Sequence, residues 1–271
     1  WKEFFATSTL FSTINGTSRC YAGYVRIPYG VDSYIPTGNP AAISPRYNLF
    51  NAGTTKKTWT EATCNQVEKW RLENDGIMLI TQDTHPTYGG ENSETFYKYL
   101  NKSMGYVDAF NTGVSNAKFE TNTGNANRLL NYLYNDGPFG SIDLSIIANQ
   151  RLVDVDNAHT AISRSTVEDT GVSILYAEGH LNSIMVFPDP DKKVVWIGEV
   201  ALVNYSHINY TKIYNNDSDG HKSRFVANLV SYIIRAAQYG SHFTDHFKKG
   251  STTQYPFDKL KTTYPEPMFY E

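Results

Sequence analysis

Short apolar runs alternate with stretches of helical spacing through the middle of the chain. Residues 60–73 place Cys64, Val67 and Trp70 on one face, which predicts an amphipathic helix. The run IMLIT follows at 77–81, directly after Asn-Asp-Gly. A strand that is apolar on both faces is typical of the interior of a covered sheet. A helix, a tight turn and a buried strand together indicate half of a βαβ unit.

Further elements follow the same two periodicities. Helices are predicted at residues 93–100, 124–137 and 223–238, and the last of these carries a wide apolar face that ends at Gly240. The segment PDPDKK combines proline with aspartates that bond locally, which predicts a turn and an antiparallel hairpin late in the chain. Strands are predicted at residues 20–30, 77–81, 142–148, 171–179, 183–188 and 193–203.

The order of these elements predicts the fold class. Helices that alternate with buried strands, followed by a hairpin and a closing helix, predict an α/β fold: a three-layer sandwich with a mostly parallel central sheet. The chain has 271 residues, and we expect a single α/β domain over residues 1–240. Residues 29–58 read as a long connection rich in proline and glycine, and residues 241–271 as an irregular C-terminal tail.

Three segments carry a resemblance to a known family: VEKWRLENDGIMLITQD at 67–83, KVVWIGEVAL at 193–202 and SRFVANLVSYIIRAA at 223–237. Together they resemble the class I glutamine amidotransferase-like domains of the flavodoxin-like α/β superfamily, over roughly residues 22–240. The resemblance implies the fold. Catalytic members of that family display a cysteine on a strand-to-helix elbow, whereas Cys20 precedes a predicted strand and Cys64 lies in a predicted helix. The resemblance therefore argues against glutaminase chemistry.

Composition limits the partners and the compartment. A net charge of -3 and a pI of about 6.2 argue against a basic surface, so we expect no nucleic-acid partner. No apolar run approaches the ~20 residues that cross a bilayer. Tyrosine at 20 positions with 19% charged residues resembles exported bacterial proteins, and we expect a periplasmic or cell-surface location. Because the sequence begins at Trp1 without a secretory signal, we expect a mature or excised fragment.

Polar side chains follow three predicted strands at their carboxyl ends, where ligands bind in open α/β sheets. Asp83, His85 and Glu199 are the candidate catalytic residues, because converging carboxylates and imidazoles suit general acid/base work. The alternative is that these side chains only satisfy backbone amides where strands leave the core. The candidate ligand-binding residues are Gln82, Asp83, His85, Tyr88, Glu178, His180 and Glu199.

Two other motifs are candidate metal sites. His242 and His246 have i, i+4 spacing, but no glutamate follows the first histidine, and a packing or surface role is the alternative. Asp217, Asp219 and Gly220 resemble part of a calcium loop, but the bidentate glutamate is missing, which favours a solvated turn. We therefore expect no metal and no cofactor.

Aromatic residues in predicted loops suggest a binding surface, since exposed rings stack on sugars or anchor protein partners. The alternative is that these rings pack the loops onto the domain. Our leading hypothesis is a non-catalytic domain that binds a carbohydrate or another surface protein. The competing hypothesis is a hydrolase that uses Asp83, His85 and Glu199, and a third is a structural spacer. The loop aromatics are Trp1, Tyr29, Tyr34, Tyr47, Trp59 and Tyr88.

Overall fold

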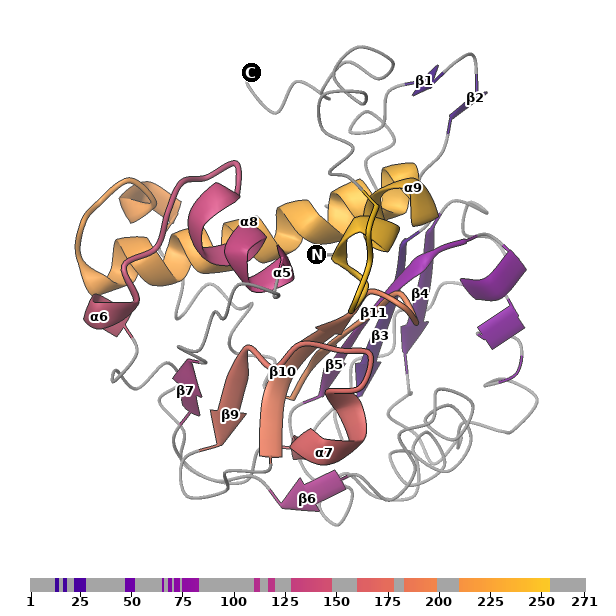
Figure 1. Ribbon diagram of the computed structural model, residues 1–271, viewed down its shortest axis with the longest axis horizontal. Coiled ribbons are helices and arrows are strands. Elements are labelled where there is room, and N and C mark those ends of the chain that lie inside the picture. Colours follow the sequence, from indigo (N-terminus) through magenta and orange to yellow (C-terminus); the bar gives the residue numbers. More distant parts are fainter. Residues whose placement is uncertain are drawn as a thin grey trace.

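A mixed sheet and a long helix dominate the protein (Figure 1). The helix α8 (Ser218–Tyr239) lies across one face of the sheet, and the short helices α5 (Arg128–Asn131) and α6 (Leu144–Ile147) lie beside it. The computed structural model describes residues 13–14, 17–18, 22–27, 47–51, 65, 68–69, 71–73, 75–82, 110–112, 117–119, 128–147, 160–177, 183–198 and 210–253.

One half of the sheet is parallel. Its strand order is β4 (Tyr47–Asn51), β3 (Ala22–Ile27), β5 (Ile77–Gln82) and β11 (Val194–Ile197). All three pairings within this half are parallel, and the pairing of β5 with β11 places Thr81 opposite Ile197. The carboxyl ends of β5 and β11 therefore lie next to each other at one edge of the sheet.

The other half is antiparallel. β10 (Ser183–Asp189) pairs with β11 in the hairpin that the sequence predicted, and Asp189 Oδ1 accepts the amides of Asp191 and Lys192 in its turn. The sheet is thus mixed, and the prediction of a mostly parallel sheet describes only its first four strands. The remaining antiparallel strands are β8 (Thr160–Ser163), β6 (Phe110–Thr112), β9 (Leu175–Ala177) and β7 (Ala117–Phe119), while β1 (Thr13–Ile14) and β2 (Thr17–Ser18) pair separately.

Both faces of the central strands are buried. Ile77 and Leu79 belong to the core cluster shared with α8, while the intervening Met78 and Ile80 point to the other face and are also 0% exposed. On that second face Phe187 stacks on Trp196, and the turn after α7 (Arg164–Val167) packs over Phe187. Residues 77–80 of the predicted run are therefore buried on both faces, as the apolar pattern indicated.

The closing helix is longer than its apolar pattern indicated. The prediction was residues 223–238, and α8 begins five residues earlier, at Ser218. Asp217 is its N-cap and accepts the amide of Gly220 at 2.9 Å, so the loop that resembled a calcium site is the first turn of the helix. Gly220 is required there, because an added Cβ would lie 2.2 Å from the carbonyl oxygen of Asn215.

The helix predicted at 124–137 is present from Arg128 with a change of pitch, and residues 124–127 lie outside the described part of the chain. α5 continues directly into the π-helix η4 (Tyr132–Asp136), and the chain leaves it at Gly137 with an extended φ of -67°. Gly137, the last residue of a second Asn-Asp-Gly, is therefore not left-handed. At the first Asn-Asp-Gly, Asp75 adopts positive φ, and its carboxylate accepts the amide and hydroxyl of Ser241.

The strand predicted at 142–148 is wrong, because part of that segment is α6. Asp143 accepts the amide and the hydroxyl of Ser145, which is the local bonding that starts a helix rather than a strand. Its apolar residues Leu144 and Ile146 pack against the core cluster and Ile147 is buried within it.

Helical structure also continues beyond Gly240, where the sequence showed no clear period. α9 (Ser241–Thr244) and the 3-10 helix η7 (Asp245–Phe247) bring Phe243 and Phe247 into the core against Tyr132 and Tyr232. The domain limits at 240 and 241, and the connection at 29–58, remain predictions, since much of both segments lies outside the described residues.

Candidate functional site

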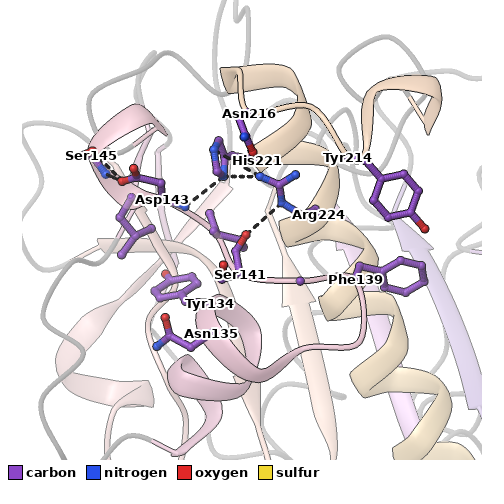
Figure 2. Close-up of a pocket in the computed structure, with 13 residues that line it drawn as sticks. Tyr134, Asn135, Phe139, Ser141, Asp143, Ser145, Tyr214, Asn216, His221 and Arg224 are labelled. Atoms are coloured by element: carbon purple, nitrogen blue, oxygen red, sulfur yellow. Dashed lines mark hydrogen bonds between the residues drawn. The ribbon is translucent and has the colours of Figure 1, made fainter.

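A hollow of about 700 Å³ opens at the amino end of α8 (Figure 2). Its walls are the start of α8, the residues that link η4 to α6, and the turn that precedes α8. Ser241, just after α8, binds Asp75 immediately before β5. The carboxyl end of α8 therefore meets the amino edge of the parallel strands. α8 is ~33 Å long over its 22 residues, so its amino end and the hollow lie about that far from Ser241.

Arg224 forms the floor of the hollow and joins its three walls. Its Nε donates to the carbonyl of Ser141 at 3.0 Å, and its Nη1 donates to the carbonyls of Ile213 and Asn215, both at 2.8 Å. Its Nη2 lies 2.7 Å from His221 Nδ1. Most of the guanidinium donors are therefore occupied inside the protein, and Arg224 acts as a clamp rather than as a free cation.

His221 connects the same helix to the segment before α6. The backbone amide of Asp143 donates to His221 Nδ1 at 3.0 Å, so this nitrogen is unprotonated and a neutral ring carries its proton on Nε2. Burial, followed by the adjacent guanidinium of Arg224, lowers the pKa of His221 below its ordinary 6.5, although Asp143 and Asp217 oppose the shift. The imidazole is therefore neutral at pH 7.

Asp143 supplies an exposed carboxylate on the rim. Hydrogen bonds from the hydroxyl and the amide of Ser145 hold the pKa of Asp143 below its ordinary 3.8. This carboxylate binds Ser145, whereas His221 receives the backbone amide of Asp143. Asp143, His221 and Ser145 therefore do not form a relay in which an imidazole would activate the serine hydroxyl.

Asn228 fixes the turn on the other wall. Its Oδ1 accepts the amide of Phe139 at 3.1 Å, and its Nδ2 donates to the carbonyls of Leu133 and Gly140. The side chain is 0% exposed and lies so close to Gly137 that any Cβ there would overlap it. Asn228 thereby determines where Phe139 stands at the mouth of the hollow.

These contacts belong to a buried polar stripe along α8, which the sequence analysis missed. The spacing alternates between three and four residues, so the stripe follows one line along the helix. Its signal was present in the sequence as a row of polar residues beside the apolar face, but nothing in the sequence indicated that this row would be buried. The stripe consists of His221, Arg224, Asn228, Ser231, Arg235 and Gln238.

Two aromatic rings and two amides complete the lining. Tyr214 is 76% exposed and Phe139 is half-buried, and Figure 2 shows both rings on one side of the hollow. Asp143 and Ser145 lie on the opposite side, with Arg224 between them. The amides of Asn135 and Asn216 add uncharged donors and acceptors. Such a lining can hold a polar ligand through stacking and hydrogen bonds.

The structure does not describe the side chains that were predicted as a site from the sequence. Asp83, His85, Tyr88, Glu178, His180 and Glu199 fall outside the described residues, as does the side chain of Gln82. The structure does show that β5 and β11 end side by side, with Thr81 opposite Ile197. β9 ends at Ala177 and runs in the same direction, because β10 pairs antiparallel with both β9 and β11.

Neither of the two candidate metal motifs gathers three metal ligands in the described part of the chain. His242 is exposed, whereas His246 is buried and bonds Arg128 and the carbonyl of Thr253. Within the described ranges, no three His, Cys, Asp or Glu side chains lie together as a metal site. Among the helices described, none is both long and apolar enough to cross a membrane.

Comparison of the chain with models of protein families, with curated proteins and with solved structures found no match. The resemblance to glutamine amidotransferase-like domains therefore stays a prediction from the three sequence segments.

Proposed function

We propose that the chain is a non-catalytic binding domain of an exported bacterial protein, and that the hollow at the amino end of α8 takes up an uncharged carbohydrate. The exposed ring of Tyr214 beside Phe139 carries this proposal, because the two rings stand at the mouth of a hollow where they can stack on a ligand. Sugars present C–H faces that stack on such rings and hydroxyls that bond to amides and carboxylates.

The charges around the hollow favour an uncharged ligand. Arg224 already donates to three carbonyls and His221 is neutral, so neither offers a free cation to an acidic sugar. Asp143 remains ionised at the rim and would repel an anion.

The test is a glycan array followed by calorimetry on the wild type and on Tyr214→Ala. We expect the substitution to weaken binding about tenfold, because one ring–sugar contact is worth about 1.4 kcal/mol. Leu72→Ala is the matched control, since Leu72 is 64% exposed but does not line the hollow. An empty array, or equal affinities for the wild type and Tyr214→Ala, would contradict the proposal.

A second candidate function is hydrolysis by Asp83, His85 and Glu199. One observation favours it: Thr81 and Ile197 are register partners, and Asp83 and Glu199 each lie two residues further along the chain. Two residues reach at most about 7 Å, so both residues start from neighbouring strand ends. A screen of chromogenic esters and glycosides with wild type and Glu199→Gln tests this; activity that survives the substitution rejects the role of Glu199.

We also propose that the scaffold is a three-layer sandwich of the glutamine amidotransferase-like type. The burial of both faces of β5 and β11 supports this arrangement, since an α/β sheet with helices on each side buries its strands in this way.

A further inference from the structure

We propose that the hollow is acid-sensitive: it is intact while His221 is neutral, and protonation of this imidazole releases Asp143 and Ser145 from the amino end of α8. The inference concerns regulation of the hollow, and its effect on carbohydrate binding rests on the function proposed above. Among the described residues that line the hollow, His221 is the only one whose side chain changes from a hydrogen-bond acceptor to a donor between neutral and mildly acidic pH. Its Nδ1 accepts the amide of Asp143 only while the ring is neutral.

The geometry around Nδ1 leaves no place for a second proton. The amide of Asp143 and the Nη2 group of Arg224 both direct N–H bonds at this one nitrogen, at 3.0 and 2.7 Å. Protonation at Nδ1 would place an N–H group against two other N–H groups. It would also add a positive charge in direct contact with a guanidinium, with His221 only 5% exposed.

The other charged groups near His221 are already engaged. Asp143 binds Ser145, and Asp217 accepts the Gly220 amide and the Asn215 side chain. Lys212 and Asp219 pair with each other on the turn and the first turn of α8. Asp143 and Asp217 favour the protonated ring, but no carboxylate of the described residues bonds to it, so burial and Arg224 prevail.

The repulsion between the protonated His221 ring and the two N–H groups is relieved only if one of these groups moves away. Arg224 and His221 belong to the buried stripe of a 22-residue helix, whereas Asp143 is an exposed residue at the start of a four-residue helix. The amide of Asp143 is therefore the partner that separates, and Ser145, which is bonded to the Asp143 carboxylate and lines the hollow, moves with it. Ser141 stays bonded to Arg224.

The direction of the pH effect follows from linkage. The folded pKa of His221 lies below 6.5, so the unfolded chain binds more protons between the two values. The contribution to stability is complete above about pH 6.5 and is lost as the pH falls through the folded pKa. Asp143 and Asp217 titrate below 3.8, which separates their effects from that of His221.

The experiment measures amide hydrogen exchange of residues 141–147 at about pH 7.5 and about pH 5, corrected for the intrinsic rate. In the wild type we expect protection of these amides to fall at the lower pH, because the protonated ring no longer accepts the amide of Asp143. His221→Asn keeps an acceptor oxygen near the position of Nδ1 but cannot titrate, so its protection should not change. His242→Asn, at an exposed histidine, should behave as the wild type.

Equal protection at both pH values in the wild type overturns the inference, and so does the same loss in His221→Asn. If His221→Asn does not fold, an NMR titration of the wild-type imidazole replaces it. A ring that titrates at 6.5 or above, or that stays neutral to about pH 5, overturns the inference. Glycan binding measured in parallel separates the two proposals: pH-dependent exchange without any glycan binding rejects the proposed function alone.

Discussion

At the scale of single residues, buried polar side chains on α8 decide where the walls of the hollow stand. Asn228 uses its amide for three backbone partners, and Arg224 uses its guanidinium for three more. Buried backbone groups need such partners, because leaving one unsatisfied costs more than the bond itself contributes. The hollow is therefore held by hydrogen bonds rather than by apolar packing alone.

We expect Asn228→Ala to destabilise the folded protein strongly. The substitution leaves the amide of Phe139 and the carbonyls of Leu133 and Gly140 without their partner, which should lower the free energy of unfolding by about 3 kcal/mol. Lys222→Ala, on the same helix but half-buried, is the control and should change it by less than about 0.5 kcal/mol. Urea denaturation compares the two, and similar midpoints would show that Asn228 is dispensable.

At the scale of elements, hydrogen bonds from polar side chains make the observed helix bounds differ from those that the apolar periodicity predicted. α8 gains a first turn because Asp217 caps it, and residues 144–147 form a helix because Asp143 bonds Ser145. Both effects come from side chains of Asp and Ser that compete for nearby amides. A pattern of apolar positions contains no information about that competition.

The cap at Asp217 can be tested by its dependence on pH. The backbone amide of Gly220, followed by the side chain of Asn215, lowers the pKa of Asp217 below its ordinary 3.8. Its stabilising effect is therefore complete above 3.8 and is lost as the pH falls through the folded pKa. We expect Asp217→Ala to lower Tm by a few degrees at neutral pH and by nothing at about pH 2.

Asp219→Ala is the matched control for the cap. It removes a carboxylate from the same helical turn, but Asp219 pairs only with Lys212 at 2.9 Å, and both side chains are about half exposed. Such a surface pair contributes little. Scanning calorimetry at neutral pH gives the Tm of both variants. If both substitutions lower Tm equally, the negative charge near the helix end stabilises the protein and the hydrogen bond from Gly220 to Asp217 does not.

At the scale of the whole molecule, the central strands are buried on both faces. Trp196 and Phe225 are each 0% exposed, yet Phe225 lies in the cluster shared with α8 whereas Trp196 stacks with Phe187 on the opposite face. We expect Trp196→Ala and Phe225→Ala each to cost about 4 kcal/mol in free energy of unfolding, because both open a large cavity.

Comparing the destabilisation by Trp196→Ala with that by Phe225→Ala tests whether the second face of the sheet is packed as tightly as the first. Leu72→Ala, at an exposed position, serves as the control and should cost less than about 0.5 kcal/mol. Chemical denaturation gives all three values. A cost for Trp196→Ala near that of the control would remove the support for a covered second face, and with it the proposed third layer.

Several of the described core elements were foreseeable from the sequence. The run at 77–81, the hairpin turn at PDPDKK and the closing helix were predicted, and each is present. These signals are local: an apolar run, a proline–aspartate turn and a 3.6-residue period each act within a few residues. The candidate site was not foreseeable in the same way, since none of the residues that line the hollow was predicted as a ligand-binding residue.

The sequence by itself determined the buried run at 77–81, the hairpin turn and the apolar face of the closing helix, because those properties depend on near neighbours in the chain. Only the tertiary structure decided that Arg224, His221 and Asn228 would be buried and would meet residues 133–143, about 80 to 95 positions away. The same polar stripe would read as a solvated helix face in the sequence alone. Its partners are backbone carbonyls and amides, which are present in almost every residue. No pattern of side chains in the sequence could therefore predict these contacts.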